Sequence, residues 1–509
     1  MRLPPFIKQT ALRTGAILLV KAIGLIVRIP LFRLLGSEGT GIYQIVYSIY
    51  GFTLTLLSGG FPTSLALLTA KDKKRGWQFF KGMVMPFLIF GAIFGLLSYA
   101  AAPYIAHFLG DDALTFPIRC LAPALFIVPM LQLYRGFLQG IEFYGYVAAS
   151  ELLEQTVRVG TMLLLVVLWM KHGIHAAAGG AVFGAFTGAS IALWFLWVLQ
   201  SRAKWMPRLD NDFDKRPIRR LIFGPGVLLF FQSSLVIALS RLIVPASDFL
   251  DAIIIPGRLQ ASGLSLSKAT AIFGEIFGMA TTVVYMPTIL TAALSYTIAA
   301  KLTADWQNGK KGDFAGRSRL SLEIAWFWGI SSTLLLFFHA DELSALIFGS
   351  SAAAVAIRYM SFVPLVAGMR ELTTTILWAA DHKRAPLFGL LLGLMGSAIA
   401  GYYLTAIPGF GYAGAAISAL VLEVVSLLWN TFMLQKRCKG TFPVILLLAD
   451  FIFLVVIGFL YAPFETFLYH IGVKSANVQT LGGLIFFAGC TAVYLLFRYW
   501  RKSERIRYR

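Results

Sequence analysis

Two cations in the first long apolar stretch of the sequence have the type and spacing that most clearly suggest chemistry. Lys21 and Arg28 stand seven residues apart, so on a helix they occupy nearly the same face. An ionisable group at membrane depth costs at least about 2.5 kcal/mol unless it faces a cavity or a partner. Since two cations on one face repel each other, we expect either carboxylate partners on other helices or a cavity that receives an anion such as a diphosphate.

A polar aromatic face follows in the next apolar stretch. Tyr43 and Tyr47 are four residues apart, Tyr50 is three residues further on, and Gln44 lies beside the first of them. Such a face can stack on sugar rings and bond to hydroxyl groups, or it can form an aromatic belt at the membrane interface. Both interpretations stay open from the sequence, and we treat Tyr43, Gln44 and Tyr47 as candidate binding residues.

Four further candidate binding residues lie in the middle of the chain. Arg241 and Arg258 could extend the cationic lining, and Gln232 belongs to a polar patch in an apolar stretch. Glu275 is a candidate counter-ion for an arginine, or a cation or proton site. The three cysteines and six histidines are scattered, and no phosphate-binding glycine loop is present. We therefore expect no catalytic residue, metal or cofactor, and a protein that is not an enzyme.

Six other charged residues are interpreted as members of structural ion pairs: Arg135, Glu154, Arg158, Arg370, Glu371 and Glu423. Glu154 and Arg158 have the favourable i,i+4 order on a helix, and Arg135 could join them. Arg370 and Glu371 are adjacent, so they do not share a helix face and should each pair with a residue of another helix.

Membrane helices must position these side chains. The chain has 509 residues, of which 58% are hydrophobic and only 13% charged, about half the usual charged share of a soluble protein. Its apolar stretches match the length of about 20 residues that crosses a bilayer core as a helix. We predict an all-α polytopic membrane protein with about fourteen transmembrane helices, approximately at 11–35, 41–70, 82–105, 115–140, 150–170, 176–200, 221–245, 267–300, 321–338, 351–379, 386–406, 412–434, 442–462 and 480–498.

The distribution of lysine and arginine predicts the orientation. Of the 44 such residues, 31 fall in the segments expected inside, whereas the outside segments hold only Lys171, Arg258 and Lys474. By the positive-inside rule both termini are cytoplasmic. The basic excess is therefore interpreted as an orientation signal and a contact for anionic lipids, with no nucleic-acid partner.

The longest inside loop and a weak internal similarity predict the domain organisation. The segment 176–185 resembles 411–420 in the same orientation, which indicates a parallel repeat. We predict four parts: an N-terminal lobe at 1–200, a basic cytoplasmic linker at 201–220, a C-terminal lobe at 221–436, and a helix pair with a basic tail at 437–509.

Three stretches carry a resemblance to a known family. "RIPLFRLLGSEGTGIYQ" (28–44) and "YRGFLQGIEFYG" followed by "ELLEQTVR" resemble the multidrug/oligosaccharidyl-lipid/polysaccharide exporter superfamily. "GRLQASGLSLSKATAIFGEIFGMATTVVYMPTILTAAL" (257–294) is similar to the branch typified by stage V sporulation protein B, which is related to the MurJ-type lipid II flippases. The resemblance extends over almost the whole chain, and the third stretch is the most specific.

The resemblance implies two six-helix lobes around a central cavity, with alternating access and a groove for a polyprenyl tail in the last two helices. It transfers cavity-lining roles to Arg28 and Arg258, and it places Lys21 where the lipid II flippases have an arginine. Two departures matter. Those flippases have a basic pair late in the second helix, where this chain reads "LTLLSGGFP", and relatives usually have a proline where the eighth helix here ends "LSYTIAAKL". The first departure weakens an assignment to lipid II itself.

The expected function is therefore a flippase in the bacterial cytoplasmic membrane. Its expected substrate is a saccharide or peptidoglycan precursor linked to a polyprenyl diphosphate, similar to lipid II, with coupling to the membrane potential or an ion gradient and cell-wall synthesis proteins as further partners. Two alternatives stay open: a drug or metabolite exporter, which predicts acidic residues in the cavity, and a non-transporting cell-wall scaffold. A membrane glycosyltransferase would need a catalytic acid on an outer loop, for which Asp111 and Asp112 are the candidates.

Overall fold

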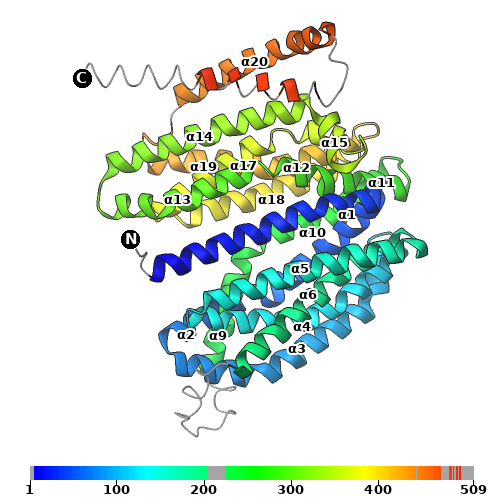
Figure 1. Cartoon of the computed structure of the whole chain (residues 1–509), viewed down its shortest axis with the longest axis vertical. Coiled ribbons are helices and arrows are strands. Elements are labelled where there is room, and N and C mark those ends of the chain that lie inside the picture. The colour runs from blue at the N-terminus through cyan, green and yellow to red at the C-terminus, as the bar shows by residue number, and fades with distance from the viewer. Residues whose placement is uncertain are drawn as a thin grey trace. The chain divides into compact units, whose positions relative to one another are not determined.

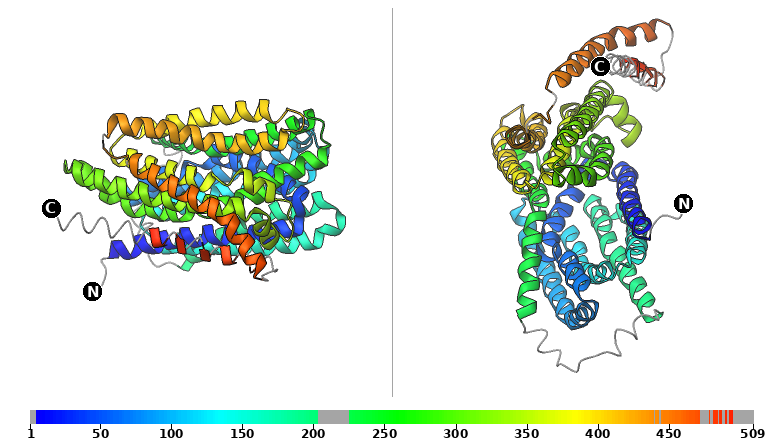
Figure 2. Two further views of the ribbon diagram at one scale, coloured as in Figure 1. Left: turned by 90° about the horizontal axis from the view of Figure 1, so that it is seen from above. Right: turned by 90° about the vertical axis from the view of Figure 1, so that its left-hand side faces the viewer.

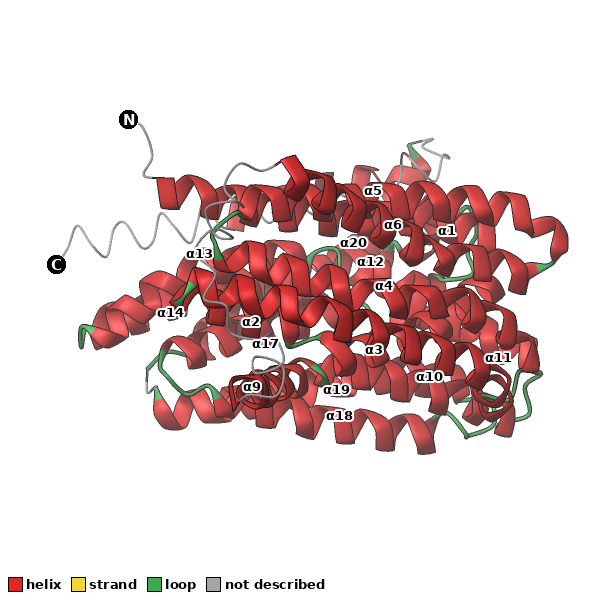
Figure 3. Ribbon diagram, turned by 90° about the horizontal axis from the view of Figure 1, so that it is seen from below, coloured by secondary structure: helices red, strands yellow, loops and turns green. Residues whose placement is uncertain are grey.

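The computed structural model describes residues 5–202, 225–438, 440–442 and 444–471, and eleven positions between 478 and 494. Within these residues every regular element is a helix, as Figure 3 shows. Contacts group the chain into two compact units, Met1–Gly278 and Met279–Arg509. The linker predicted at 201–220 falls almost entirely outside the described residues, and the proposed four-part division stays a prediction.

The first unit contains these elements in order: α1 (Pro5–Ser58), α2 (Phe61–Lys71), α3 (Lys73–Phe108), η1 (Asp112–Leu114), α4 (Thr115–Gly140), α5 (Tyr144–Trp169), η2 (Met170–His172), α6 (Ile174–Arg202), α9 (Pro225–Arg241), α10 (Ile243–Ala261) and α11 (Leu266–Phe273). The helices α3, α4, α5 and α6 run side by side (Figure 1), and α1 packs against α5, α6 and α10.

The second unit contains α12 (Thr281–Val284), α13 (Thr288–Gln307), α14 (Lys311–Phe338), α15 (Ala340–Phe348), α16 (Ala354–Tyr359), α17 (Val363–Ala379), α18 (Arg384–Leu404), α19 (Gly411–Arg437) and α20 (Val444–His470). The π-helical segment η3 (Gly274–Ala280) spans the boundary of the two units. Within the second unit α18 packs along α19, seen as neighbouring yellow and orange helices in Figure 2. Helix α17 contacts α13, α14 and α19. Apolar side chains such as Met369 and Leu372 fill this core.

The described residues confirm the all-α polytopic membrane class. Nine of their helices are long and apolar enough to cross a membrane, and the pair Leu266–Val284 and Thr288–Gln307, bent by 52°, would make a tenth. The count of fourteen stays a prediction. The bend falls at a proline, because Pro287 caps the start of α13 and cannot donate a helical hydrogen bond.

A break at Gly36 turns α1 into a helical hairpin. Its φ of 65° and ψ of −173° interrupt the helix, and glycine adopts a positive φ at little cost because it lacks a Cβ atom. The rings of Phe32 and Tyr43, on opposite sides of this break, meet edge to face with centroids 6.3 Å apart. The two arms therefore lie against each other, which brings residues near Arg28 close to residues near Tyr47.

One predicted connection is wrong. The segment 246–262 was expected to be an outer loop, but α10 runs through it from Ile243 to Ala261. Asp248 and Asp251 lower the hydropathy of this stretch and so gave it the appearance of a loop. A polar residue can sit within a helix of a membrane protein when it faces other protein groups instead of lipid, and α10 packs on α1.

Candidate functional site

Arginines from two helices converge on a group of tyrosines in the first unit. The rings of Tyr43 and Tyr47 stack with centroids 5.5 Å apart, and Tyr50 follows at 6.0 Å. Both Arg28 of α1 and Arg158 of α5 interact electrostatically with the phenol of Tyr43. The hairpin at Gly36 and the packing of α1 on α5 thus assemble one polar cluster from residues far apart in sequence. We call Arg28, Tyr43, Tyr47, Tyr50 and Arg158 the cationic cluster.

A shared carboxylate holds Arg158 in place. Glu154 accepts a bond of 2.7 Å from Arg158 and another of 2.7 Å from Arg135, whose Nε also donates to Ser150 at 3.0 Å. All three charged side chains are largely buried. Since two guanidinium groups share one carboxylate, one positive charge remains. The Nε of Arg158 and Nη2 of Arg135 are buried without a hydrogen-bond partner among the described residues, so protein groups do not satisfy these two donors.

An acidic pair lies on α10 with Asp248 near the cationic cluster, and neither aspartate is among the candidates predicted from the sequence. Asp248 interacts electrostatically with Arg28, and Asp251 interacts with Asp248. The side chain of Asp248 is exposed, whereas Asp251 is only 6% exposed. Their i,i+3 spacing within an apolar helix was the signal that could have revealed them. In the described part of the chain, Arg28 makes no direct ion pair within 4.0 Å, so Asp248 acts on it from a greater distance.

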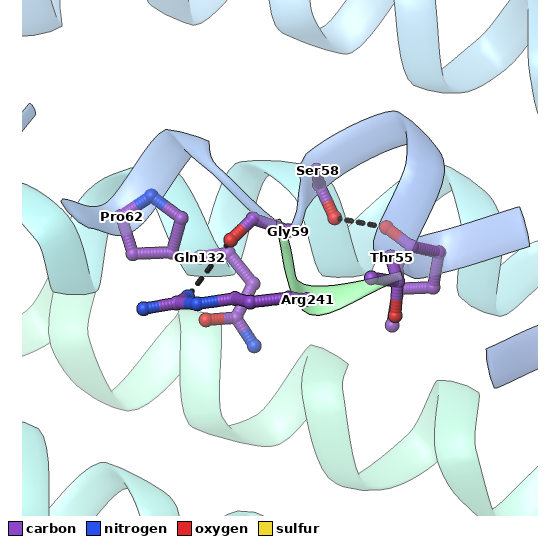
Figure 4. A pocket seen from close by; sticks show the side chains of 7 residues that line it. Thr55, Ser58, Gly59, Pro62, Gln132 and Arg241 are labelled. Atoms are coloured by element: carbon purple, nitrogen blue, oxygen red, sulfur yellow. Dashed lines mark hydrogen bonds between the residues drawn. The ribbon is translucent and has the colours of Figure 1, made fainter. Parts of the chain in front are cut away.

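The predicted binding residue Arg241 lies at another site of the same unit. Its Nη1 donates to the carbonyl of Gly59 at 2.9 Å and its Nη2 to Thr63 Oγ1 at 3.0 Å. The side chain borders a cavity of about 250 Å³, shown in Figure 4, which is lined by Leu54, Thr55, Ser58, Gly59, Pro62, Gln132 and Arg241. Arg241 thus contacts the break between α1 and α2.

The other candidate binding residues are distributed over the same unit. Gln44 lies half-buried on α1, and its Oε1 has no described hydrogen-bond partner. Gln232 is exposed on α9, while Arg258 and Glu275 are half-buried on α10 and η3 and take part in further interactions. The side chain of Lys21 lies outside the described residues, so its place relative to Arg28 stays a prediction.

The predicted ion-pair residues of the second unit lie on facing helices. Arg370 of α17 pairs through Nε with Glu423 of α19, and Tyr285 donates to the same carboxylate at 3.0 Å. Glu371 accepts from Thr291 at 3.4 Å, so the two adjacent charged residues have different partners. Glu423 is buried and shared between a cation and a phenol, an arrangement that ties α17 to α19.

The outer-loop acid considered for a glycosyltransferase is engaged in a local contact. Asp111 accepts from the N–H of Ala113 at 3.0 Å and lies 3.2 Å from Nε2 of His175. The bond to His175 is the main reason why the pKa of Asp111 lies below its usual value. Asp111 therefore links the loop before α4 to the start of α6. No group of three or more His, Cys, Asp or Glu side chains suited to a metal occurs among the described residues.

Comparisons with known proteins agree in sequence and in structure. A family model described as "Polysaccharide biosynthesis protein" matches residues 6–294. Stage V sporulation protein B of Bacillus subtilis is 26% identical over 510 residues, covering 98% of this chain and 96% of the relative. The lipid II flippase MurJ of Bacillus subtilis is 22% identical over 450 residues, covering 82% of this chain and 80% of that protein.

Two solved structures show the same fold at low identity. A lipid II flippase MurJ in an inward closed conformation matches with a TM-score of 0.68 and 14% identity, covering 95% of this chain and 98% of that one. A multidrug resistance MATE transporter of the MOP superfamily in an inward-facing conformation matches with a TM-score of 0.64 and 14% identity, covering 83% of this chain and 96% of that one.

Proposed function

Because this chain belongs to the polysaccharide biosynthesis protein family, we propose that it moves a lipid-linked saccharide across the bacterial cytoplasmic membrane by alternating access. The curated relatives support this proposal, since one is a lipid II flippase and another is stage V sporulation protein B. The fold supports it as well, because MurJ is among its structural neighbours. The substrate would be a saccharide or peptidoglycan precursor on a polyprenyl diphosphate, and both termini would be cytoplasmic.

The cationic cluster is the observation on which the proposal rests. Two guanidinium groups from α1 and α5 lie around stacked tyrosines, and the Arg158 group carries more positive than negative charge. Guanidinium groups bind phosphate oxygens through two parallel hydrogen bonds, and phenol rings stack on sugars. In this proposal the arginines hold the diphosphate while the tyrosines contact the saccharide next to it.

The acidic pair supplies a mechanism for release and coupling. In the empty protein Asp248 partly neutralises Arg28, and an arriving diphosphate would compete with it for the cation. Asp248 or Asp251 would then be the groups that take up a proton or another cation, which would couple transport to an ion gradient or the membrane potential. Anionic lipids at the basic cytoplasmic segments and cell-wall synthesis proteins stay predicted partners.

The decisive test is flipping of a fluorescent lipid II in proteoliposomes that contain the full chain. We expect Arg28→Ala to abolish flipping at near-normal membrane abundance, because it makes no direct ion pair among the described residues whose loss would strand a carboxylate. Arg28→Lys should retain partial activity, since it keeps the charge and loses the planar fork. Arg384→Ala, at an exposed arginine in the first turn of α18, is the matched control and should flip normally. Normal flipping by Arg28→Ala would refute the assignment.

Asp248 and Asp251 also favour a second candidate, an exporter of organic cations, because such a transporter needs acidic groups to bind its substrate. The same proteoliposomes separate the two functions. Uptake of a cationic dye that is lost in Asp248→Asn and retained in Arg28→Ala would support the exporter. Loss of lipid flipping in Arg28→Ala without any dye transport supports the flippase.

A further inference from the structure

Two helix breaks meet at Arg241. The first lies between the end of α1 at Ser58 and the start of α2 at Phe61, and the second separates α9 from α10 at Leu242. The backbones touch here, because a Cβ atom on Gly60 would lie 1.8 Å from the carbonyl oxygen of Ser234 in α9. Glycine is therefore required for this approach of α2 to α9, and the bond from Arg241 to Gly59 joins the two breaks.

The positive charge of Arg241 is not balanced at this junction. Its guanidinium donates only to a backbone carbonyl, that of Gly59, and to the hydroxyl of Thr63. Both acceptors are neutral, and no carboxylate forms an ion pair with Arg241 within the described residues. A phosphate oxygen is a stronger partner for a guanidinium than a neutral acceptor. An anion that reached Arg241 could therefore take the place of these bonds.

The cavity beside Arg241 has room for such an anion, and its lining adds a few polar side chains to largely apolar surface. Its volume of about 250 Å³ far exceeds the roughly 10–15 Å³ that admits a single water. Figure 4 draws the amide of Gln132 next to the guanidinium on this cavity, and Thr55 lines it as well. These groups add neutral donors to the charged one.

The start of α2 borders the same cavity through Pro62, whose nitrogen carries no N–H. This helix has 11 residues and begins after Gly60, where no side chain caps its free N–H groups. The first turn of a helix carries a partial positive charge that favours anions. A guanidinium and neutral polar side chains thus border one cavity, whose lining is otherwise largely apolar, within one unit of the structure.

We propose that this cavity is a second phosphate-binding site, separate from the cationic cluster, which receives the diphosphate of the lipid-linked substrate during its passage. The assignment to that substrate rests on the proposed function, whereas phosphate binding itself does not. Binding would withdraw Arg241 from Gly59, so the anion and the helix break compete for one guanidinium. Occupancy would therefore release the contact that joins the two breaks.

Binding is measured on the full chain in detergent by calorimetric titration with pyrophosphate, in the Arg28→Ala background, which weakens the other site. Adding Arg241→Gln should weaken binding on the order of 10- to 100-fold, because charged hydrogen bonds are lost. Adding Arg241→Lys should weaken it less, since the charge remains. Equal affinities in the glutamine and lysine variants would assign Arg241 a merely structural role and overturn the proposal.

A variant that leaves the helix break intact provides an independent check. Gln132→Leu changes a cavity-lining side chain that donates to neither Gly59 nor Thr63, and should weaken pyrophosphate binding about 2- to 10-fold. Arg384→Ala is again the matched control and should bind with unchanged affinity. Unchanged binding in Gln132→Leu would contradict this placement of the anion.

A competition experiment identifies the source of the phosphate. Farnesyl diphosphate, which carries a short prenyl tail, should displace pyrophosphate in the Arg28→Ala background and should lose affinity in parallel when Arg241→Gln is added. Pyrophosphate binding that farnesyl diphosphate does not disturb would overturn the assignment to a lipid-linked substrate. A failure of lipid II flipping would leave these binding results unaffected, so the two proposals fail separately.

Discussion

Replacing Glu154 by glutamine should destabilise the protein more than any other single change in its ion-pair group. The carboxylate holds both Arg135 and Arg158 at 2.7 Å and is only 13% exposed. Glutamine would leave two buried guanidinium groups without a counter-charge, for a cost on the order of 3–5 kcal/mol. Arg158→Gln removes one cation and leaves Glu154 bonded to Arg135, so it should cost only about 1.5–3 kcal/mol.

The assay is thermal unfolding of purified full chain in detergent, together with membrane abundance, for Glu154→Gln, Arg158→Gln and the double variant. We expect a large loss of thermal stability for Glu154→Gln and a smaller loss for Arg158→Gln. The double variant should lose less stability than the two single variants lose together, because only the guanidinium of Arg135 is then left without a counter-charge. Lipid II flipping should be strongly reduced in Arg158→Gln even where abundance is near normal. Equal destabilisation by the two single changes, or strict additivity, would refute the shared-carboxylate argument.

Three shorter predictions concern other features. Gly60→Ala should lower stability by about 1–3 kcal/mol, because its Cβ would lie 1.8 Å from a carbonyl of α9, whereas Gly51→Ala, with nothing within 4 Å, should be neutral in the same unfolding assay. The lowered pKa of Asp111 means that its contact with His175 stabilises the protein above about pH 4 and is lost as the pH falls below that value. Asp111→Asn should therefore flatten the decrease in stability measured between pH 6 and pH 3. Cysteines placed in 301–319 should react with impermeant reagents only from the cytoplasmic side, and labelling from outside intact cells would contradict the predicted orientation.

The fold class followed from hydropathy, because long apolar stretches in a bilayer leave the backbone few choices besides a helix. Local pairs could also be predicted, as for Glu154 and Arg158, since their spacing alone brings them together. The partner of Arg370 could be placed only on another helix, because helix packing and not spacing decides which carboxylate it meets.

Asp248 and Asp251 were missed for a related reason. Hydropathy is averaged over a window, so two carboxylates lower the mean of an apolar stretch and make it resemble a loop. The average gives no indication that Asp248 interacts with an arginine on a neighbouring helix. The position of Arg241 at two helix breaks was equally hidden, because the contact joins residues about 180 positions apart. Contacts between residues so far apart leave no periodic pattern in the sequence from which they could be predicted.

The hairpin at Gly36 also has a consequence for biosynthesis. Arg28 and the three tyrosines are synthesised within one short stretch, whereas Arg158 leaves the ribosome some 130 residues later. At about 5–20 residues per second, roughly ten seconds pass before α5 can dock on the hairpin. During that interval an arginine sits on a newly inserted helix at an insertion cost of about 2.5–3.5 kcal/mol. The ring of Tyr43, already folded back beside it by the glycine, is a polar neighbour that the growing chain offers before α5 is made.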